Sequence, residues 1–423
     1  MKARLGLMMF LEYAIWGAWA PVLWPYLTDT LGLGQSQAGW IFSLLWLACL
    51  LAPLTGGQVA DRWLPTQSFL GIAHLVGGAI LLVLGRRTGA GPGAFGPWLG
   101  LMGAYSLVFA PTLALTNSIV FHHLSEADFG RIRVFGTIGW IASGLILSGW
   151  RRGLVPSPAG CDAILLAGGL SLVLGAYCFT LPHTPPARGR ADPLAFRRAL
   201  VLLRDRNTLA FLAIAFLVTT ELQFYYGPTG GFLESALRVP HAAVPMTMAV
   251  AQAAEILALA FALPVALKRW GLRGTLALGV LAWPLRYLVF ALAPLGPVGV
   301  MRPLVIGSLT LHGIGFTFFF VASQIFIDRV APTDIRASAQ SLLTLVTLGL
   351  GNFLGTLLTA TVMQHFTRGM GAAATTQWTS VFLVPCLLTL ACAAGYFLLV
   401  REPARPGSEA WEQRPKAWER SFD

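Results

Sequence analysis

The chain has 423 residues, of which 56% are apolar and 11% are charged, and its formal net charge is +11. Soluble globular proteins carry about 25% charged residues, so this composition excludes an ordinary soluble domain. A basic excess can indicate nucleic-acid binding, but here the charges fall between long apolar runs, which favours a membrane protein without a nucleic-acid partner.

The apolar runs are about 20 residues long, which is enough for an α-helix to cross a bilayer core. We therefore predict an all-α polytopic membrane protein with twelve transmembrane helices in two six-helix pseudo-symmetric halves. The predicted spans cover residues 6–30, 37–60, 66–86, 97–121, 131–151, 162–182, 207–233, 243–267, 272–294, 299–327, 336–364 and 378–400.

The basic residues are unevenly distributed over the predicted loops. With both termini in the cytoplasm, 21 of the 29 Lys and Arg residues lie on the cytoplasmic side, seven lie on the opposite side, and Arg286 lies within a span. This bias is typical of helical membrane proteins, whose short cytoplasmic loops are rich in Lys and Arg. We therefore expect both termini to be cytoplasmic.

The longest connection between two predicted spans is HTPPARGRADPLAFRRALVLLRDR, which is rich in Pro and Arg. We interpret it as a cytoplasmic linker between the two halves. The predicted organisation is an N-terminal six-helix bundle over residues 1–182, the linker over 183–206, a C-terminal six-helix bundle over 207–400 and a cytoplasmic tail over 401–423.

Few polar side chains lie away from the ends of the predicted spans. Ionisable groups at membrane depth are costly, so each is a candidate for function. The ionisable ones are Glu12, His74, Glu221, Glu255, Arg286 and His312, and the uncharged ones are Asn117, Gln223, Gln252, Gln340 and Asn352.

Several of these residues share one helix face with a polar or aromatic neighbour, because residues three, four or seven positions apart lie close together on a helix. Gln252 and Glu255 in AVAQAAEILAL are three apart, and we expect them to line a cavity. The other shared faces are Arg133, Thr137 and Trp140; Gln223 and Tyr226; and His312 and Phe316. In a transporter such faces meet at a central cavity between the halves.

Other polar residues have a structural alternative. Interhelical hydrogen bonding is the favoured role of Asn117, Gln340 and Asn352. For Arg286 we favour pairing with a carboxylate or with helix carbonyls. His74 has no polar companion at helical spacing, which favours packing. Glu12 either acts on the substrate or proton or reaches the membrane interface, and the two alternatives stay equally open. His312 either packs between helices or contacts a ligand, and these also stay equally open.

The stretch VTTELQFYYGP carries polar groups within the seventh predicted span. Glu221 and Gln223 point about 200° apart, because successive helical residues rotate by about 100°. One side chain can therefore face a cavity while the other faces a neighbouring helix. Gly227-Pro228 then interrupts the helix, since Pro lacks the N–H and disrupts the preceding turn.

The polar set suits a flat ring that carries hydroxyl groups. Amide side chains donate and accept on one edge, which matches a nucleobase or a sugar. The aromatic side chains that could stack on a ring are Trp140, Tyr225, Tyr226 and Phe316. A nucleoside fits this set, and a simple sugar fits nearly as well on chemistry alone.

An intramembrane enzyme would need a nucleophile and base that converge, or a metal-binding pattern such as H-E-x-x-H. The sequence has neither pattern, and the pair His122-His123 with Glu126 falls at a span end. The five cysteines form no C-x-x-C motif. We therefore expect a protein that is not an enzyme and has neither a cofactor nor a metal ion.

Several stretches also resemble one known family in order along nearly the whole chain. They are WGAW, GGQVADRWL, PTLALTN, RIRVFGTIGW, LPHTPP, ELQ, AQAAE, LAWPLR and IRASAQ. GGQVADRW is similar to the loop signature of the major facilitator superfamily, and the full set resembles its nucleoside:proton symporter family, typified by bacterial nucleoside permeases.

The resemblance implies a nucleoside site and a location in the bacterial inner (cell) membrane. The family's binding residues fall on Arg133, Thr137, Trp140, Gln223, Gln252, Glu255 and Phe316. Three positions depart from the family: Tyr226 replaces an asparagine, His312 replaces a tyrosine, and Thr317 replaces an acid. The departures concern base recognition and proton coupling.

We therefore expect a secondary active transporter that imports nucleosides by proton symport with alternating access. The alternative is a facilitator or symporter for a nucleobase or sugar on the same fold. Glu255 is the first candidate for proton coupling, with Glu12 and Glu221 in reserve. Tyr226 and His312 join the expected binding residues, and we expect a monomer in the lipid bilayer.

Overall fold

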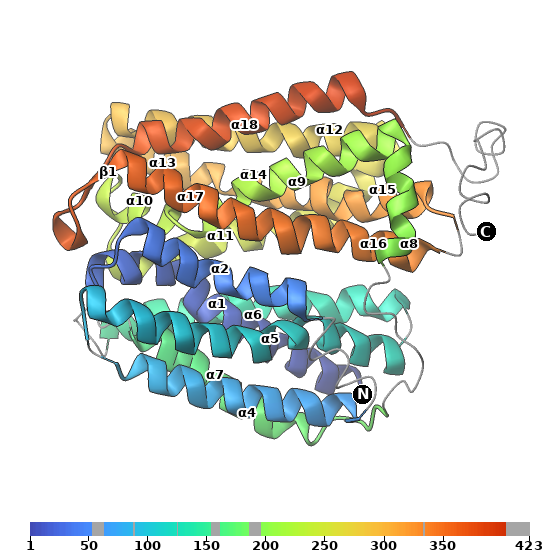
Figure 1. The fold of residues 1–423 in the computed structure, drawn as a ribbon. Coiled ribbons are helices and arrows are strands. Elements are labelled where there is room, and N and C mark those ends of the chain that lie inside the picture. The colour runs from blue at the N-terminus through green and yellow to red at the C-terminus, as the bar shows by residue number, and fades with distance from the viewer. Residues whose placement is uncertain are drawn as a thin grey trace.

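The computed structural model describes residues 1–52, 63–87, 89–124, 126–153, 161–185, 196–332 and 335–402. The first group of helices lies together on one side of the molecule (Figure 1). Its members are α1 (Lys2–Pro25), which continues as a π-helical turn over Tyr26–Thr30, α2 (Gln35–Leu51), α4 (Thr66–Gly85), α5 (Phe95–His123), α6 (Glu126–Gly153) and α7 (Cys161–Cys178).

The second group of helices covers the other side (Figure 1). It comprises α8 (Phe196–Ala199), α9 (Arg206–Tyr226), α10 (Thr229–Ser235), α11 (Val244–Leu257), α12 (Leu263–Leu292), α13 (Val298–Ser308), α14 (Thr310–Gly315), α15 (Ala322–Val330), α16 (Arg336–Thr344), α17 (Asn352–Phe366) and α18 (Trp378–Leu399). Two short antiparallel strands, β1 (Thr367–Arg368) and β2 (Thr375–Thr376), connect α17 to α18.

The described residues contain nine helical segments that are long and apolar enough to cross a membrane, and two shorter apolar helices at Gln35–Leu51 and Asp162–Cys178. One of the nine, His241–Leu295, is broken at Gly271, whose φ of 66° favours glycine. Counting this segment as two spans and adding the two shorter helices gives a number of spans in the described residues that is consistent with the twelve predicted. The chain is therefore an all-α polytopic membrane protein.

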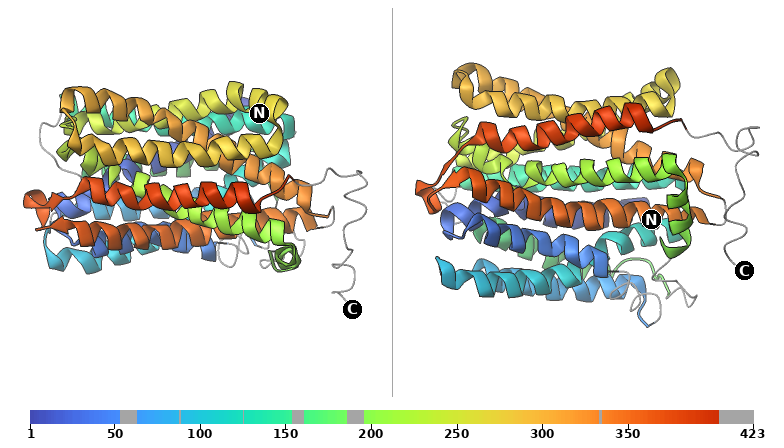
Figure 2. Two further views of the ribbon diagram at one scale, coloured as in Figure 1. Left: turned by 90° about the horizontal axis from the view of Figure 1, so that it is seen from above. Right: turned by 45° about the horizontal axis from the view of Figure 1, so that its top comes forward.

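Each group is held together by contacts among its own helices, and the two groups meet along other pairs of helices. In the first group α1 packs on α6 and α7, and α4 packs on α5 and α7; in the second, α12 packs on α18, and α9 packs on α17 and α18. The groups meet along α2 with α17 and along α6 with α11. All long helices run roughly parallel to one axis (Figures 1 and 2).

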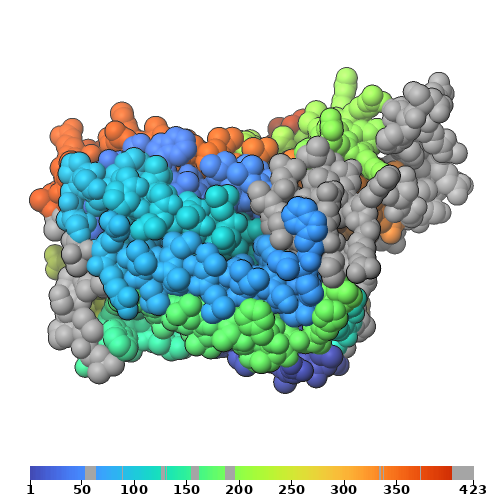
Figure 3. Space-filling view, turned by 60° about the horizontal axis from the view of Figure 1, so that its bottom comes forward, coloured from blue at the N-terminus to red at the C-terminus, as the bar shows by residue number. Residues whose placement is uncertain are grey.

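Figure 3 shows the outer face of the molecule that α4, α5 and α7 form. Ile72, Val76 and Val83 in α4, Leu107 in α5 and Val173 in α7 are exposed. A helix that is apolar on its outer face as well as on its inner face is typical of a membrane span. This surface therefore agrees with the membrane prediction from hydropathy.

Glycines bring α1 and α6 into backbone contact. A Cβ atom at Gly139 would collide with the carbonyl oxygen of Phe10, and one at Gly17 would lie 2.8 Å from the Cα of Trp140. Small residues allow such close approach between membrane helices, where dispersion contacts replace the hydrophobic driving force. The close contact fixes the positions of Arg133, Thr137 and Trp140 along the axis of α1.

The two groups touch at the end where α1 finishes and α11 begins. The backbone N–H of Met246 donates to Ser148 Oγ at 3.1 Å. A Cβ atom at Gly230 would lie 3.1 Å from the Pro21 carbonyl oxygen, and one at Gly144 would lie 3.3 Å from that of Pro245. The interface is therefore closed at this end, which lies opposite the N-terminus.

The predicted break in the seventh span is confirmed. Helix α9 ends at Tyr226 and α10 begins at Thr229, with Gly227 and Pro228 between them. Gly227 also packs against Trp24 of α1, because a Cβ atom there would lie 3.1 Å from the indole ring. The broken helix is thus buried in protein, where freed backbone groups are tolerated.

We predict that Gly139→Ala destabilises the protein by about 1–3 kcal/mol, because the added methyl group must push α1 away from α6. The measurement is the thermal unfolding midpoint of purified protein in detergent. Gly149→Ala in the same helix is the matched control, since nothing lies within 4 Å of a Cβ atom there. An equal midpoint for the two variants would contradict the packing argument.

Candidate functional site

Glu12 is fully buried and is paired within the first group of helices. Thr112 Oγ1 of α5 donates to Glu12 Oε1 at 2.7 Å, and His74 Nε2 of α4 lies 2.8 Å from Glu12 Oε2. Ser171 Oγ of α7 donates to the His74 backbone carbonyl at 2.9 Å. Helices α4 and α5 therefore contact one carboxylate of α1, and α7 is joined to this group through His74. The predicted packing role of His74 is wrong, because His74 pairs with an acid.

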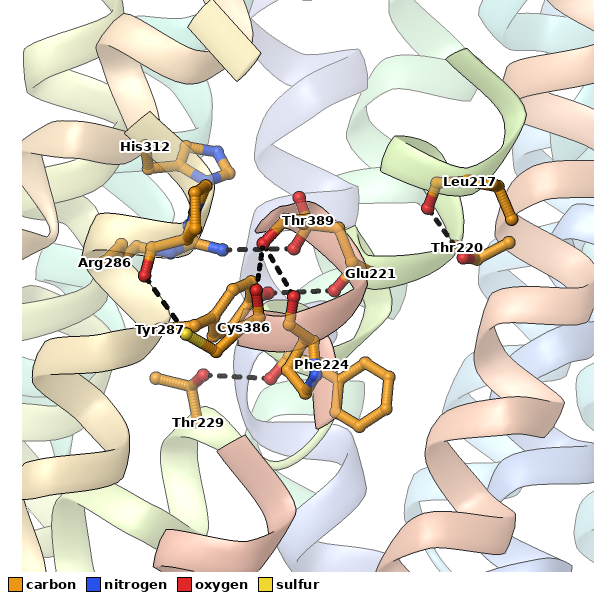
Figure 4. A network of polar contacts seen from close by, with 12 residues as sticks. Leu217, Thr220, Glu221, Phe224, Thr229, Arg286, Tyr287, His312, Cys386 and Thr389 are labelled. Atoms are coloured by element: carbon orange, nitrogen blue, oxygen red, sulfur yellow. Dashed lines mark hydrogen bonds and ion pairs between the residues drawn. The ribbon is translucent and has the colours of Figure 1, made fainter. Parts of the chain in front are cut away.

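Glu221 is the corresponding buried carboxylate of the second group. Its Oε2 lies 3.7 Å from Arg286 Nη2 of α12, and both side chains are fully buried. The Tyr287 hydroxyl donates to the Glu221 backbone carbonyl at 2.8 Å (Figure 4). The prediction that Arg286 pairs with a carboxylate is confirmed.

The two pairs occupy similar places in their halves. Glu12 and Glu221 lie in the first long helix of each group, and His74 and Arg286 lie in the third. Spacing along one helix cannot reveal a contact between two helices, so the Glu12–His74 pair is missed by that reasoning. The repeated order of an acid and then a basic residue in the two halves is the signal that could have found it.

Glu255 makes no ion pair among the described residues, and it differs from both because the cation whose field acts on it belongs to the other group of helices. It is half-buried in α11, and the cation that attracts it is Arg133 of α6. The Arg133 guanidinium carbon lies 4.0 Å from the ring centroid of Tyr13 in α1. An attraction therefore acts between the two halves, across the interface of α6 with α11.

Aromatic rings form a continuous line across the same interface. Trp16 lies 5.2 Å from Trp140, Trp140 lies 6.2 Å from Tyr226, and Tyr226 lies 6.0 Å from His312, all measured between ring centroids. His312 then stacks on Phe316 at 6.0 Å. The structure thus brings together aromatic residues from α1, α6, α9 and the tenth predicted span.

The two glutamines have different environments. Gln223 Nε2 donates to Asn352 Oδ1 at 2.7 Å, and Thr356 Oγ1 donates to Gln223 Oε1 at 3.2 Å, so this amide is bound to α17. Gln252 is 5% exposed, and in the described part of the chain its Oε1 has no hydrogen-bond partner. Gln252 therefore keeps an acceptor for a ligand, whereas Gln223 must exchange a partner to bind one.

The predicted structural amides behave unequally. Asn352 joins α17 to α9 through Gln223, and Gln340 Nε2 donates to the Gln324 carbonyl at 2.8 Å, so both connect two helices. Asn117 Nδ2 donates to the Leu113 carbonyl of its own helix at 3.1 Å. Interhelical bonding is confirmed for the first two residues, and the bond of Asn117 stays within α5.

Two further predicted residues lie on the same faces. Thr137 is half-buried in α6, one turn from Arg133. Phe316 opens a π-helical segment, Phe316–Val321, and Thr317 within it is buried with no partner for its hydroxyl among the described residues. π-Helical turns often occur at functional sites. Most of the GGQVADRW signature falls on residues 53–62, outside the described residues.

Comparison with known proteins shows to which family the chain belongs. A family model described as nucleoside H+ symporter matches residues 1–405. The putative nucleoside transporter YegT of Escherichia coli (strain K12) is 36% identical over 374 residues, which cover 86% of this chain and 84% of that protein. The nucleoside permease NupG of Escherichia coli (strain K12) is 28% identical over 403 residues, or 91% and 92% of the two chains.

Solved structures of transporters have the same fold as this chain. A crystal structure of the nucleoside transporter NupG superimposes with a TM-score of 0.81 at 26% identity, covering 94% of this chain and 98% of that one. The xylose transporter XylE from Escherichia coli gives a TM-score of 0.66 at 11% identity, which is a likeness of fold. The relatives are transporters and permeases rather than enzymes. The chain therefore has the major facilitator fold and belongs to the nucleoside H+ symporter family.

Proposed function

We propose that this protein imports nucleosides together with protons by alternating access. Family membership supports the class of substrate and the coupling ion. The observation that carries the proposal is the position of Glu255, whose attracting cation, Arg133, lies across the interface between the two halves. A carboxylate in that position changes its electrostatic surroundings whenever the halves move apart.

Glu255 is preferred over the two other candidate carboxylates for this reason. Glu12 and Glu221 are fully buried and are paired within one half. Their surroundings move with them as a rigid body, so rocking of the halves does not alter their partners. Glu255 loses or gains the field of Arg133 during the same motion, which couples its protonation to the conformational cycle.

The proposed binding site has a polar part and an aromatic part. Gln252 and Glu255 supply acceptors for the base and for ribose hydroxyls, and Arg133, Thr137 and Gln223 supply donors. The rings proposed to enclose the base are Trp140, Tyr226, His312 and Phe316. These groups come from both halves, as alternating access requires.

The proposed boundaries are 1–182 and 207–400 for the two rocking bundles, 183–206 for the linker and 401–423 for the tail. We place both termini in the cytoplasm, because Lys and Arg are concentrated on that side. The closed end of the interface then faces outward. We further propose that the protein works as a monomer in the lipid of a bacterial inner membrane.

We predict that proteoliposomes containing the pure protein take up a labelled nucleoside faster under an inward proton gradient than without one. A panel of nucleosides, nucleobases and sugars identifies the substrate, and empty liposomes give the background. Selective uptake of a sugar with no response to nucleosides would replace the proposed substrate.

We predict that Gln252→Ala weakens substrate binding by up to about tenfold, because it removes one hydrogen bond worth about 0.5–1.5 kcal/mol. Titration calorimetry of purified protein measures the affinity. Gln340→Ala is the control, since that amide bonds the backbone of Gln324. An affinity equal to wild type would exclude direct contact with Gln252.

We predict that Glu255→Gln abolishes the response of uptake to the proton gradient while nucleoside exchange continues, because the amide keeps the shape but cannot titrate. Counterflow of labelled nucleoside in preloaded proteoliposomes measures exchange. Glu234→Gln is the control, because that carboxylate pairs with His241 and is partly exposed. If wild-type uptake ignores both the pH gradient and an uncoupler, the protein is a facilitator.

A further inference from the structure

The hydrogen bond between Arg286 and His312 fixes the chemical form of the histidine. Arg286 Nη1 lies 2.9 Å from His312 Nδ1, and both side chains are fully buried. A guanidinium group donates hydrogen bonds and cannot accept them, so Nδ1 must be the acceptor. An imidazolium ion would place an N–H against an N–H. His312 is therefore a neutral imidazole with its proton on Nε2.

Arg286 is itself held firmly in the position that imposes this form. Its guanidinium carbon lies 4.9 Å from the ring centroid of Tyr225, 4.8 Å from that of Trp283 and 4.5 Å from that of Tyr287. Glu221 balances its charge from α9 (Figure 4). The three cation–π contacts and the Glu221 carboxylate together leave the guanidinium little freedom to turn away from His312.

The Nε2–H of His312 is a buried donor that no described residue accepts. The centroid of the His312 ring lies 4.5 Å from that of Tyr225, 6.0 Å from that of Phe316 and 5.6 Å from that of Trp283. Tyr226 meets it edge-on at 6.0 Å. His312 is a fully buried member of the aromatic line at the interface, and its neighbours Tyr226 and Phe316 are only half-buried. A buried donor without a partner is unfavourable, which favours its use in binding.

We propose that His312, held as the Nε2–H tautomer by Arg286, donates a hydrogen bond to an acceptor atom of the substrate's base. Arg286 is the positioning residue, and the acceptor is a ring nitrogen or a carbonyl oxygen. This inference rests on the proposed nucleoside function and adds a rule of specificity to it. A hydroxyl or amide at this place can accept as well as donate, whereas the locked imidazole only donates.

The test compares nucleosides with analogues that lack one acceptor or have a weaker one. Adenosine is paired with 3-deazaadenosine and with 7-deazaadenosine, in each of which a C–H group replaces one ring-nitrogen acceptor, and uridine with 4-thiouridine, in which sulfur weakens the acceptor at position 4. Affinities are measured for wild type, for His312→Phe, which has no donor, and for His312→Gln, which keeps one. For one analogue we expect binding to wild type and to His312→Gln that is about three- to tenfold weaker than that of its parent nucleoside. In His312→Phe we expect that analogue and its parent to bind equally well.

The inference is overturned if the analogue loses as much affinity relative to its parent in His312→Phe as in wild type. It is also overturned if no analogue binds wild type more weakly than its parent, and nucleoside transport remains intact in both cases. Failure of wild type to bind any parent nucleoside would instead overturn the proposed function. The two failures are therefore distinguishable, because one concerns a ratio of affinities and the other the parent affinity itself.

The role of Arg286 has a readout that does not depend on transport. In protein labelled with 15N-histidine, nuclear magnetic resonance should show His312 as a single neutral tautomer with the proton on Nε2, and His312→Gln identifies its signals. Arg286→Lys keeps a donor and should preserve that tautomer, whereas Arg286→Met should give a mixture. A wild-type signal from the Nδ1–H tautomer or from imidazolium would overturn the inference even if neither Arg286 variant folds.

Discussion

Compensation of buried charge is the constraint on which this structure depends. An isolated charge within a bilayer is costly, and removing one partner of a buried ion pair typically costs about 3–5 kcal/mol. The protein meets this constraint by pairing Glu221 with Arg286 in one half, and in the other half it surrounds the Glu12 carboxyl group with the polar side chains of His74 and Thr112. Each pair joins the first long helix of its half to the third, so each half is held together as a unit.

The same constraint distinguishes the remaining carboxylate. Glu255 is attracted by Arg133, but these residues lie in α11 and α6, on opposite sides of the interface. Rigid halves with a charge attraction between them form a two-state element, because opening the interface must either separate the charges or neutralise one of them. In the proposed mechanism, proton binding to Glu255 provides the neutralisation, and the proposed substrate site lies beside it along the aromatic line from Trp16 to Phe316.

The fold, and which polar residues lie within the spans, could be predicted well from the sequence, because both follow from local properties. Length and hydropathy identify spans, and the Gly227-Pro228 break follows from the chemistry of proline. Contacts between helices are set by tertiary packing, so they were accessible only in outline. The Arg286 pairing could be predicted from charge alone, whereas the Glu12–His74 pair and the binding of Gln223 to Asn352 required the arrangement of the helices in space.

The central claim is that Glu255 carries the proton that moves with the substrate. The most direct measurement is the internal pH of proteoliposomes, reported by a trapped dye, when nucleoside is added outside without an imposed gradient. Wild type should acidify the interior in proportion to nucleoside entry, and Glu255→Gln should cause no acidification although it still exchanges nucleoside in preloaded proteoliposomes. Equal acidification by the two proteins would contradict the account.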